Sequence, residues 1–299
     1  MLPRPLHTIP AAHDHDDDHD DHGGLHRDLL ATGRTMDRRR LLRLGARWGL
    51  GLGAMQLLGC ASDSVAGPDT TGTTTTPSTG TTATPTAGGS CSRIPEETAG
   101  PYPGDGSNGA NVLNQTGVAR SDMRSSFAGL SGTAAGVPLL IELTLVSATT
   151  CEPLADRAVY LWHCDRAGLY SLYSAGVTNQ NYLRGVQKAD AEGKVRFTSI
   201  FPGCYAGRWP HIHFEVFASL AAATDVRNKV ATSQIALPKA TSDLVYATSG
   251  YEASVRNLAG ITLATDNVFR DGSALELATV TGSVAQGFTA ALTVGVLGA

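Results

Sequence analysis

Short segments in the second half of the chain alternate between hydrophobic and polar residues with a period of two. In "LLIELTLV" (139–146), Ile141, Leu143 and Leu145 fall on one face of an extended chain. An alternation of this kind predicts a β-strand that is buried on one side. The same reasoning predicts further short strands at 157–164, 194–200, 211–217, 232–238, 274–280 and 288–296.

Gly, Pro, Asp and Asn separate these predicted strands, and helix signals are few. Short helical pieces are expected at 218–229 and 242–248, and "DNVFRDG" (266–272) indicates a turn. Residues 93–135 show little periodicity and are expected to form a long ordered loop or arm. A series of short strands joined by turns is typical of a sandwich or barrel, so the sequence predicts one all-β domain over 93–299.

The chain before this domain has a different composition. Residues 1–35 contain the His- and Asp-rich run "AAHDHDDDHDDH", which cannot form a core and is expected to be a disordered tail. At Met36 the sequence starts afresh with an export-like segment, and we expect natural translation to begin there, so that 1–35 are absent from the natural protein. Residues 61–92 are rich in Thr, Gly and Pro and are expected to form a flexible linker.

Residues 36–60 resemble an export signal of the twin-arginine type. Arg38 and Arg39 precede an apolar run that is too short to span a bilayer stably. The segment ends in "LLGC", which resembles a lipobox whose cysteine, Cys60, is lipidated after cleavage. We therefore expect a domain that is exported and is lipid-anchored at the cell envelope or is periplasmic or extracellular, with membrane contact only through that anchor.

The net charge and the cysteine content further limit the kinds of protein that this sequence can encode. The chain of 299 residues has a formal net charge of −4, which gives no indication of a nucleic-acid partner. Four cysteines remain besides Cys60, and an even number in an exported domain suggests disulfides. We expect two pairs, Cys91 with Cys151 and Cys164 with Cys204. Free buried thiols are the alternative.

The stretch "GRWPHIHF" (207–214) places His211 and His213 two positions apart on a predicted strand. Side chains at i and i+2 point to one face, about 6.6 Å apart, so both imidazoles can bind one metal ion. Two tyrosines, Tyr170 and Tyr205, stand in turns that follow predicted strands. Phenolate is a hard anionic donor, so two phenolates with two imidazoles favour Fe(III).

Glu215 is an alternative ligand, because it shares a predicted face with His211 and His213. Two histidines with one carboxylate would suit a non-haem Fe(II) site. Three ligands at successive i, i+2 steps span about 13 Å along a strand, however, which is too far for one ion. Glu215 is therefore expected to be solvated or salt-bridged. His163, in "WHCD", is expected to be a structural histidine.

Four stretches of the sequence resemble the intradiol ring-cleavage dioxygenases. They are "ETAGPYP" (97–103), "WHCDRAGLYSLY" (162–173), "NYLRGVQKADAEGKVRFTSIFPGCYAGRWPHIHFEV" (181–216) and "ATSQIALP" (231–238). The motifs G-x-Y, P-G-x-Y and R-x-x-H-x-H occur in order, and the likeness covers nearly all of 91–299. The exported and tethered form resembles the extracellular branch of the family.

The resemblance implies a prealbumin-like β-sandwich, with long loops and one or two short helices, that carries a mononuclear Fe(III). The matching metal ligands are Tyr170, Tyr205, His211 and His213. The other matching residues are Arg208 beside the bound aromatic ring, Gln234 in the same pocket and Tyr102 at the substrate mouth. Trp209 stands directly before Pro210 in a shortened segment, so we expect it to alter the wall of the substrate pocket.

The implied reaction takes a small aromatic diol of the catechol type and O2, and breaks the ring between the two hydroxyl-bearing carbons to give a muconate-type diacid. In the mechanism that the resemblance implies, Tyr205 leaves the metal when substrate binds and helps to accept a proton, while Tyr170 stays. Arg208 is expected to stabilise charge that develops on the ring. The alternative is a non-catalytic sandwich that acts as an exported binding module without a metal.

Overall fold

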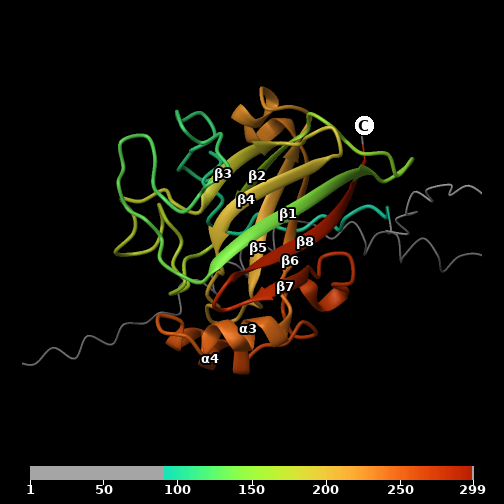
Figure 1. Ribbon diagram of the computed structural model, residues 1–299. Coiled ribbons are helices and arrows are strands. Elements are labelled where there is room, and N and C mark those ends of the chain that lie inside the picture. The colour runs from blue at the N-terminus through green and yellow to red at the C-terminus, as the bar shows by residue number, and fades with distance from the viewer. Residues whose placement is uncertain (1–90, 298–299) are drawn as a thin grey trace, which may run out of the picture. The chain divides into compact units, whose positions relative to one another are not determined.

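The computed structural model describes residues 91–297, whose strands form two four-stranded sheets (Figure 1). The first sheet has the order β4-β1-β8-β7, with the bounds Lys194–Ile200, Pro138–Ser147, Gly287–Val296 and Thr279–Ser283. The second has the order β3-β2-β5-β6, with the bounds Arg184–Lys188, Ala158–Trp162, His211–Phe217 and Lys229–Ala236. Neighbouring strands are antiparallel except β1 and β8, which are parallel.

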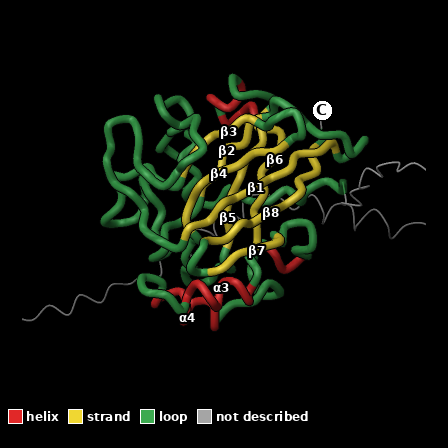
Figure 2. The backbone as a smooth tube through the Cα atoms, in the orientation of Figure 1, coloured by secondary structure: helices red, strands yellow, loops and turns green. Residues whose placement is uncertain are grey.

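Two α-helices, α3 (Lys239–Tyr246) and α4 (Glu252–Ala259), lie side by side at one end of the sandwich (Figure 2). Single turns of 3-10 helix occur at η1 (Ala222–Thr224), η2 (Val226–Asn228) and η3 (Phe269–Asp271). The prediction of an all-β sandwich with long loops and one or two short helices is therefore confirmed. Among residues 91–297, no helix has the length and apolar character that crossing a membrane requires.

The alternating pattern of β1 reflects a strand with one face in the core. Every second residue from Leu139 to Leu145 is at most 1% exposed. These side chains share one hydrophobic core with Ile212, Phe214 and Val216 of β5, which belongs to the other sheet. The two sheets thus face each other across this core, as in other β-sandwiches.

Strand β5 differs from β1, because all seven of its residues are buried. Its even-numbered residues face the sandwich core, so His211, His213 and Glu215 point to the opposite face of the second sheet. A second hydrophobic cluster covers that face and joins residues of β2 to residues of the long arm, among them Val112 and Leu113. The arm predicted over 93–135 therefore buries the face on which the two histidines lie.

Most of the predicted strands are confirmed, namely those at 139–146, 157–164, 194–200, 211–217 and 288–296. The strand predicted at 232–238 lies slightly earlier, at Lys229–Ala236. The prediction of a strand at 274–280 is wrong for most of its length, since β7 begins only at Thr279. The backbone N–H groups of Glu276 and Leu277 instead donate to the carbonyl of Ser273 and form a turn.

The other differences concern short elements. Strand β3, "RGVQK", has one apolar residue between polar ones and was not predicted; its pairing with β2 makes it a strand. Helix α4 was also missed, and α3 begins earlier than the predicted 242–248. The segment 218–229 forms only the single turns η1 and η2.

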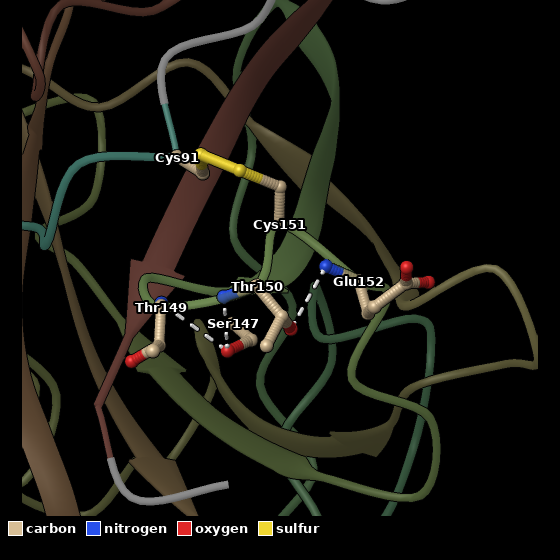
Figure 3. The surroundings of a disulfide bond; sticks show 6 residues. All are labelled: Cys91, Ser147, Thr149, Thr150, Cys151 and Glu152. Carbon is tan, nitrogen blue, oxygen red and sulfur yellow. Dashed lines mark hydrogen bonds between the residues drawn. A yellow bond between two sulfur atoms is a disulfide. The ribbon is translucent and has the colours of Figure 1, made fainter.

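A disulfide joins Cys91 to Cys151, with the two Cα atoms 5.3 Å apart and 60 positions between them in the sequence (Figure 3). The bond attaches the start of the described domain to the turn that follows β1. In that turn, the side-chain oxygen of Ser147 accepts the N–H groups of Thr149 and Thr150 at 3.3 and 3.1 Å. The first predicted cysteine pair is confirmed.

The second predicted pair, Cys164 with Cys204, is wrong, because both residues are buried free thiols. Each sulfur atom points to a different carbonyl group. Sγ of Cys164 donates to the carbonyl of Gly203 at 3.4 Å, and Sγ of Cys204 to that of Arg208 at 3.4 Å. Burial raises the pKa of both thiols, so they remain protonated and unreactive.

Several predictions concern parts of the chain outside the described residues. They are the His/Asp-rich tail (1–35), the export signal (36–60) with the lipidation site Cys60, and most of the linker (61–92).

Removing the disulfide should destabilise the domain. The double variant Cys91→Ala/Cys151→Ala should lose about 2–4 kcal/mol of unfolding free energy, because the unfolded chain is no longer constrained by a 60-residue separation. Urea unfolding followed by tryptophan fluorescence measures the change. As a control, reductant should lower the stability of the wild type but not that of the double variant. Equal stability of the two oxidised proteins would show that the bond contributes nothing.

Candidate metal centre

Four side chains with metal-binding donor atoms converge on the outer face of the second sheet. His211 and His213 come from β5, Tyr170 from a turn after β2, and Tyr205 from the loop between β4 and β5. Nε2 of His211 lies 3.1 Å from Nε2 of His213, 3.2 Å from the hydroxyl oxygen of Tyr205 and 3.4 Å from that of Tyr170. The structure therefore brings together all four residues that the sequence predicts as ligands.

A glycine two positions before each tyrosine lets the two tyrosine-bearing segments approach each other. Gly168 has a φ of +85°, and a Cβ atom there would lie 3.2 Å from Cβ of Tyr205. A Cβ atom on Gly203 would lie 2.6 Å from the carbonyl oxygen of Arg166. A side chain at either position would push the segments apart. The glycines of G-x-Y and P-G-x-Y are thus geometric requirements of this site.

The turn that carries Tyr170 is held by the buried carboxylate of Asp165. One carboxylate oxygen, Oδ1, accepts the backbone N–H groups of Ala167 and Leu169 at 2.9 and 3.0 Å. The other, Oδ2, accepts the hydroxyl of Tyr182 at 3.1 Å. A side chain that replaces backbone hydrogen bonds in this way fixes the conformation of a loop.

The two imidazole rings are oriented by different contacts. Nδ1 of His211 hydrogen-bonds the carbonyl of Trp209, which leaves a lone pair on Nε2 of the neutral ring. The ring of His213 stacks on the indole of Trp162, with centroids 5.0 Å apart and an angle of 5° between the planes. Burial lowers the pKa of both histidines, aided by Arg208 at His211 and by His211 at His213. Both rings are therefore neutral and suited to metal binding.

The two phenols differ in burial. Tyr170 is 1% exposed, whereas Tyr205 is only partly buried. Burial, with a smaller contribution from neighbouring Tyr205, raises the pKa of Tyr170 well above its ordinary value. A positive charge between the donors would have the opposite effect, because it favours the phenolate.

The chemistry of this donor set fits Fe(III). Phenolate oxygens are hard anionic ligands, imidazole nitrogens suit iron among other metals, and four such donors are in reach of one ion. Within residues 91–297, no group of three or more His, Cys, Asp or Glu side chains could hold a metal ion.

Arg208 lies beside the donor group and is held in a buried network. Its guanidinium is 1% exposed, and Nε donates to Oδ2 of Asp266 at 3.0 Å. Nη2 donates to the side-chain oxygen of Gln234 at 2.7 Å, and the Gln234 amide nitrogen donates to the carbonyl of Thr98 at 2.9 Å. The network fixes a positive charge close to the histidines, whose pKa values it lowers.

Asp266 is the residue of this network that the sequence analysis missed. It is wholly buried, and besides Arg208 it accepts the backbone N–H groups of Trp209, Val268 and Phe269. An Asp at the start of a turn is ordinarily exposed, and "DNVFRDG" predicts only that turn. Nothing in the pattern indicates that this carboxylate meets an arginine 58 positions earlier in the chain.

Two further polar residues near the site have structural roles. Glu215 is wholly buried and binds the ammonium of Lys229 at 3.0 Å, so the predicted salt bridge is confirmed and the solvated alternative is wrong. Burial raises the pKa of Glu215 to about 7 against the effect of Lys229. Both ring nitrogens of His163 have partners at 2.7 Å, the carbonyl of Cys164 and the hydroxyl of Ser199, as expected of a core histidine.

The two predicted pocket residues lie in different environments. The ring centroid of Tyr102 is 4.9 Å from that of Tyr170 and 5.3 Å from that of Tyr173, so Tyr102 borders the donor group. Trp209 is 4% exposed and packs into the sandwich core, where its indole N–H donates to the carbonyl of Leu237 at 2.8 Å. This packing gives no support to the expectation that Trp209 forms a wall of the substrate pocket.

Comparisons with known proteins agree with the motifs. Residues 114–227 match the family model described as Dioxygenase. An intradiol ring-cleavage dioxygenase from Tetranychus urticae is similar in structure, with a TM-score of 0.54 and 24% identity over 69% of this chain and 95% of that one. A dioxygenase domain from Streptomyces sp. SirexAA-E has a TM-score of 0.44 and 21% identity, over 68% and 96%. No curated protein sequence matches this chain significantly.

These findings concern the class of protein to which the chain is similar. The resemblance to the intradiol ring-cleavage dioxygenases is confirmed: the middle of the domain matches a dioxygenase family model, and the two sheets share the fold of an intradiol enzyme. The match covers the turn with Tyr170, the loop with Tyr205 and the strand with His211 and His213.

Replacing Asp266, the buried partner of Arg208, should destabilise the domain. Asp266→Asn keeps the shape of the side chain but presents an amide to a buried guanidinium, and should destabilise the domain by about 3–5 kcal/mol. Urea unfolding of Asp266→Asn, Arg208→Gln and the double variant measures this. The double variant should recover part of the loss, because it leaves no unpaired charge.

The matched control is Asp243→Asn, which breaks the exposed ion pair with Lys239 on α3 and should cost at most about 1 kcal/mol. Equal effects of the two Asp→Asn changes would contradict the role assigned to Asp266.

Proposed function

We propose that this protein is an Fe(III)-dependent intradiol dioxygenase, which opens a catechol-type ring between its two hydroxyl-bearing carbons with O2 and forms a muconate-type diacid. The observation that carries the proposal is the convergence of two phenol oxygens and one imidazole nitrogen within 3.1–3.4 Å of Nε2 of His211. The fold similarity and the family match support the same reaction class.

Tyr170, Tyr205, His211 and His213 would hold the iron. Bound Fe(III) would supply a Lewis-acidic centre that binds the diol oxygens and makes the ring reactive toward dioxygen. The remaining requirements of the reaction fall on the protein. Substrate must be oriented, its hydroxyl protons must be accepted, and charge that develops on the ring must be stabilised.

Tyr205 is suited to accept a substrate proton. It is less buried than Tyr170, so its side chain can move with less loss of packing. The tyrosine phenol has a solution pKa of ~10, so its phenolate is basic enough to take up a proton from a bound diol. Tyr170 is enclosed by the second hydrophobic cluster and is the phenol that stays in place.

Arg208 is suited to stabilise the charge that develops on the ring. Asp266 and Gln234 hold its guanidinium before substrate arrives, so no reorganisation is needed during the reaction. Preorganised charge of this kind is commonly the largest contribution to catalysis. Gln234 lies opposite His213 in the β5–β6 pairing, which places it in the same layer as the metal ligands.

We also propose that the enzyme is exported by a twin-arginine-type route and is tethered by lipid on Cys60. The disulfide between Cys91 and Cys151 supports export, because such bonds persist in oxidising compartments.

The test of function begins with the metal and the product. Protein made with iron available should contain a single iron ion and absorb visible light through phenolate-to-Fe(III) charge transfer. With catechol and O2 it should release a muconate-type diacid, detected by mass spectrometry. His211→Ala and His213→Ala should lose the metal and the colour. Bound zinc or copper in place of iron would contradict the proposal, as would a colourless protein that binds diols without cleaving them, the behaviour of a binding module.

Removing the hydroxyl group of Tyr205 should have a different effect on the enzyme from removing that of Tyr170. Tyr205→Phe should still bind iron and catechol, but turnover should fall by ~10²–10⁴, the usual effect of losing an acid–base group. Tyr170→Phe should weaken iron retention more than it weakens proton transfer. Stopped-flow absorbance with catechol and iron analysis after gel filtration separate these effects. Turnover of Tyr205→Phe at the wild-type rate would refute the role of Tyr205 as the base.

A further inference from the structure

Arg184, at the start of β3, is a second buried arginine near the donor group. Arg184 is 1% exposed, and the three nitrogens of its side chain make five hydrogen bonds. The acceptors are all neutral oxygens: the carbonyls of Tyr102, Pro103 and Ser171, and the hydroxyls of Ser171 and Tyr160. A buried guanidinium held in this way is unusual, because burying a charge is costly unless its hydrogen-bonding groups are satisfied.

Four of these five hydrogen bonds go to two segments that border the site, and the fifth goes to the hydroxyl of Tyr160 on β2. Nη1 and Nη2 donate to the carbonyls of Pro103 and Tyr102 at 2.6 and 2.9 Å, and both residues belong to the long arm. Nη2 and Nε also donate to the carbonyl and the hydroxyl of Ser171, at 2.9 and 3.1 Å. Ser171 directly follows the predicted ligand Tyr170. One planar side chain thus connects the arm to the segment that carries a metal ligand.

The arm is shaped to accept this side chain. Gly104 has a φ of +65°, and a Cβ atom there would lie 2.7 Å from Nη1 of Arg184. Only glycine lets the backbone pass so close to the guanidinium at this positive φ. The N–H of Gly104 donates to the hydroxyl of Tyr173 at 2.9 Å, which is a further contact between the arm and the segment that follows Tyr170.

The consequence for the site is the place of Tyr102. Arg184 binds the backbone carbonyl of Tyr102 and so fixes the backbone from which its ring projects, and that ring lies 4.9 Å from the ring of Tyr170 and 5.3 Å from that of Tyr173. A lysine cannot replace this arrangement, since an ammonium is a point charge with three donors, whereas the guanidinium is a rigid planar fork with five.

We propose that Arg184 is a positioning residue of the reaction, which fixes Tyr102 at the substrate mouth and Tyr170 at the metal as one unit through its bonds to the arm and to Ser171. The inference rests on the proposed function, because the mouth and the metal are those of the dioxygenase. Arg184 acts through Tyr102 and Tyr170, and its own partners leave it no donor for substrate.

The test uses Arg184→Lys in the full chain, with two readouts. In metal-free protein, amide hydrogen exchange at 100–106 and 169–175 should become faster by at least about tenfold, as expected when hydrogen bonds to a charged donor are lost. Exchange in β5 should not change. In iron-loaded protein, the KM for catechol should rise while kcat changes less, because the mouth is displaced more than the chemistry.

The matched control is Arg120→Lys. Arg120 also donates to carbonyl groups, those of Arg184, Met123 and Ser125, and its hydrogen bonds involve neither Tyr102 nor Ser171. It should leave exchange at 100–106 and 169–175 unchanged. If Arg184→Lys does not fold, Ser171→Ala replaces it, since that variant removes one acceptor of the guanidinium and should accelerate exchange at 169–175.

Unchanged exchange at both segments in Arg184→Lys would overturn the proposal. Faster exchange throughout the domain, including β5, would also overturn the proposal if Arg120→Lys accelerated exchange to the same extent. Arg184 would then be only a structural residue. Failure of the wild type to cleave catechol would refute the proposed function instead, and the exchange measurements on metal-free protein would still decide the part played by Arg184.

Discussion

The site depends on the position of β5 in the middle of the second sheet. Hydrogen bonds to β2 on one side and β6 on the other fix its register, with His213 opposite Trp162 and Gln234. Because side chains alternate along a strand, this register places both histidines on one face and the apolar residues between them in the sandwich core. A slip of one residue would bury the imidazoles in that core and expose the apolar side chains to the site. The loops with the two tyrosines and the buried Arg208 assemble around this fixed pair.

Without a positive charge at its centre, the donor group reduces the stability of the folded protein. Nε2 of His211 has two phenol oxygens and a second imidazole nitrogen within 3.1–3.4 Å, and burial holds the pKa of Tyr170 well above its ordinary value. A cation between the donors would favour the phenolate form of Tyr170, and a cation that binds only the folded state adds stability through linkage. Arg208 counteracts the rise in the pKa of Tyr170 only in part, and its guanidinium is already bound by Asp266 and Gln234. The arrangement therefore supports the proposal that this site binds a metal ion.

The sequence predicted most of the fold and the four donors, because both depend on local pattern. Alternation identified β1 and β5, and the motifs around Tyr170, Tyr205, His211 and His213 occur within short stretches. The missed features depend on contacts between distant segments. Asp266 gains its role from Arg208, 58 positions away, and β3 is a strand because it pairs with β2. The thiols of Cys164 and Cys204 were misjudged for the same reason, since only the folded chain determines which carbonyl groups they face.

The central claim is that one metal ion lies between the four convergent donors. Anomalous X-ray diffraction at the iron absorption edge, from crystals of protein made with iron available, tests it most directly. The account predicts a single strong peak in contact with the hydroxyl oxygens of Tyr170 and Tyr205 and with Nε2 of His211 and His213. A peak at any other set of side chains would contradict the account, as would well-ordered density for the four residues with no peak between them.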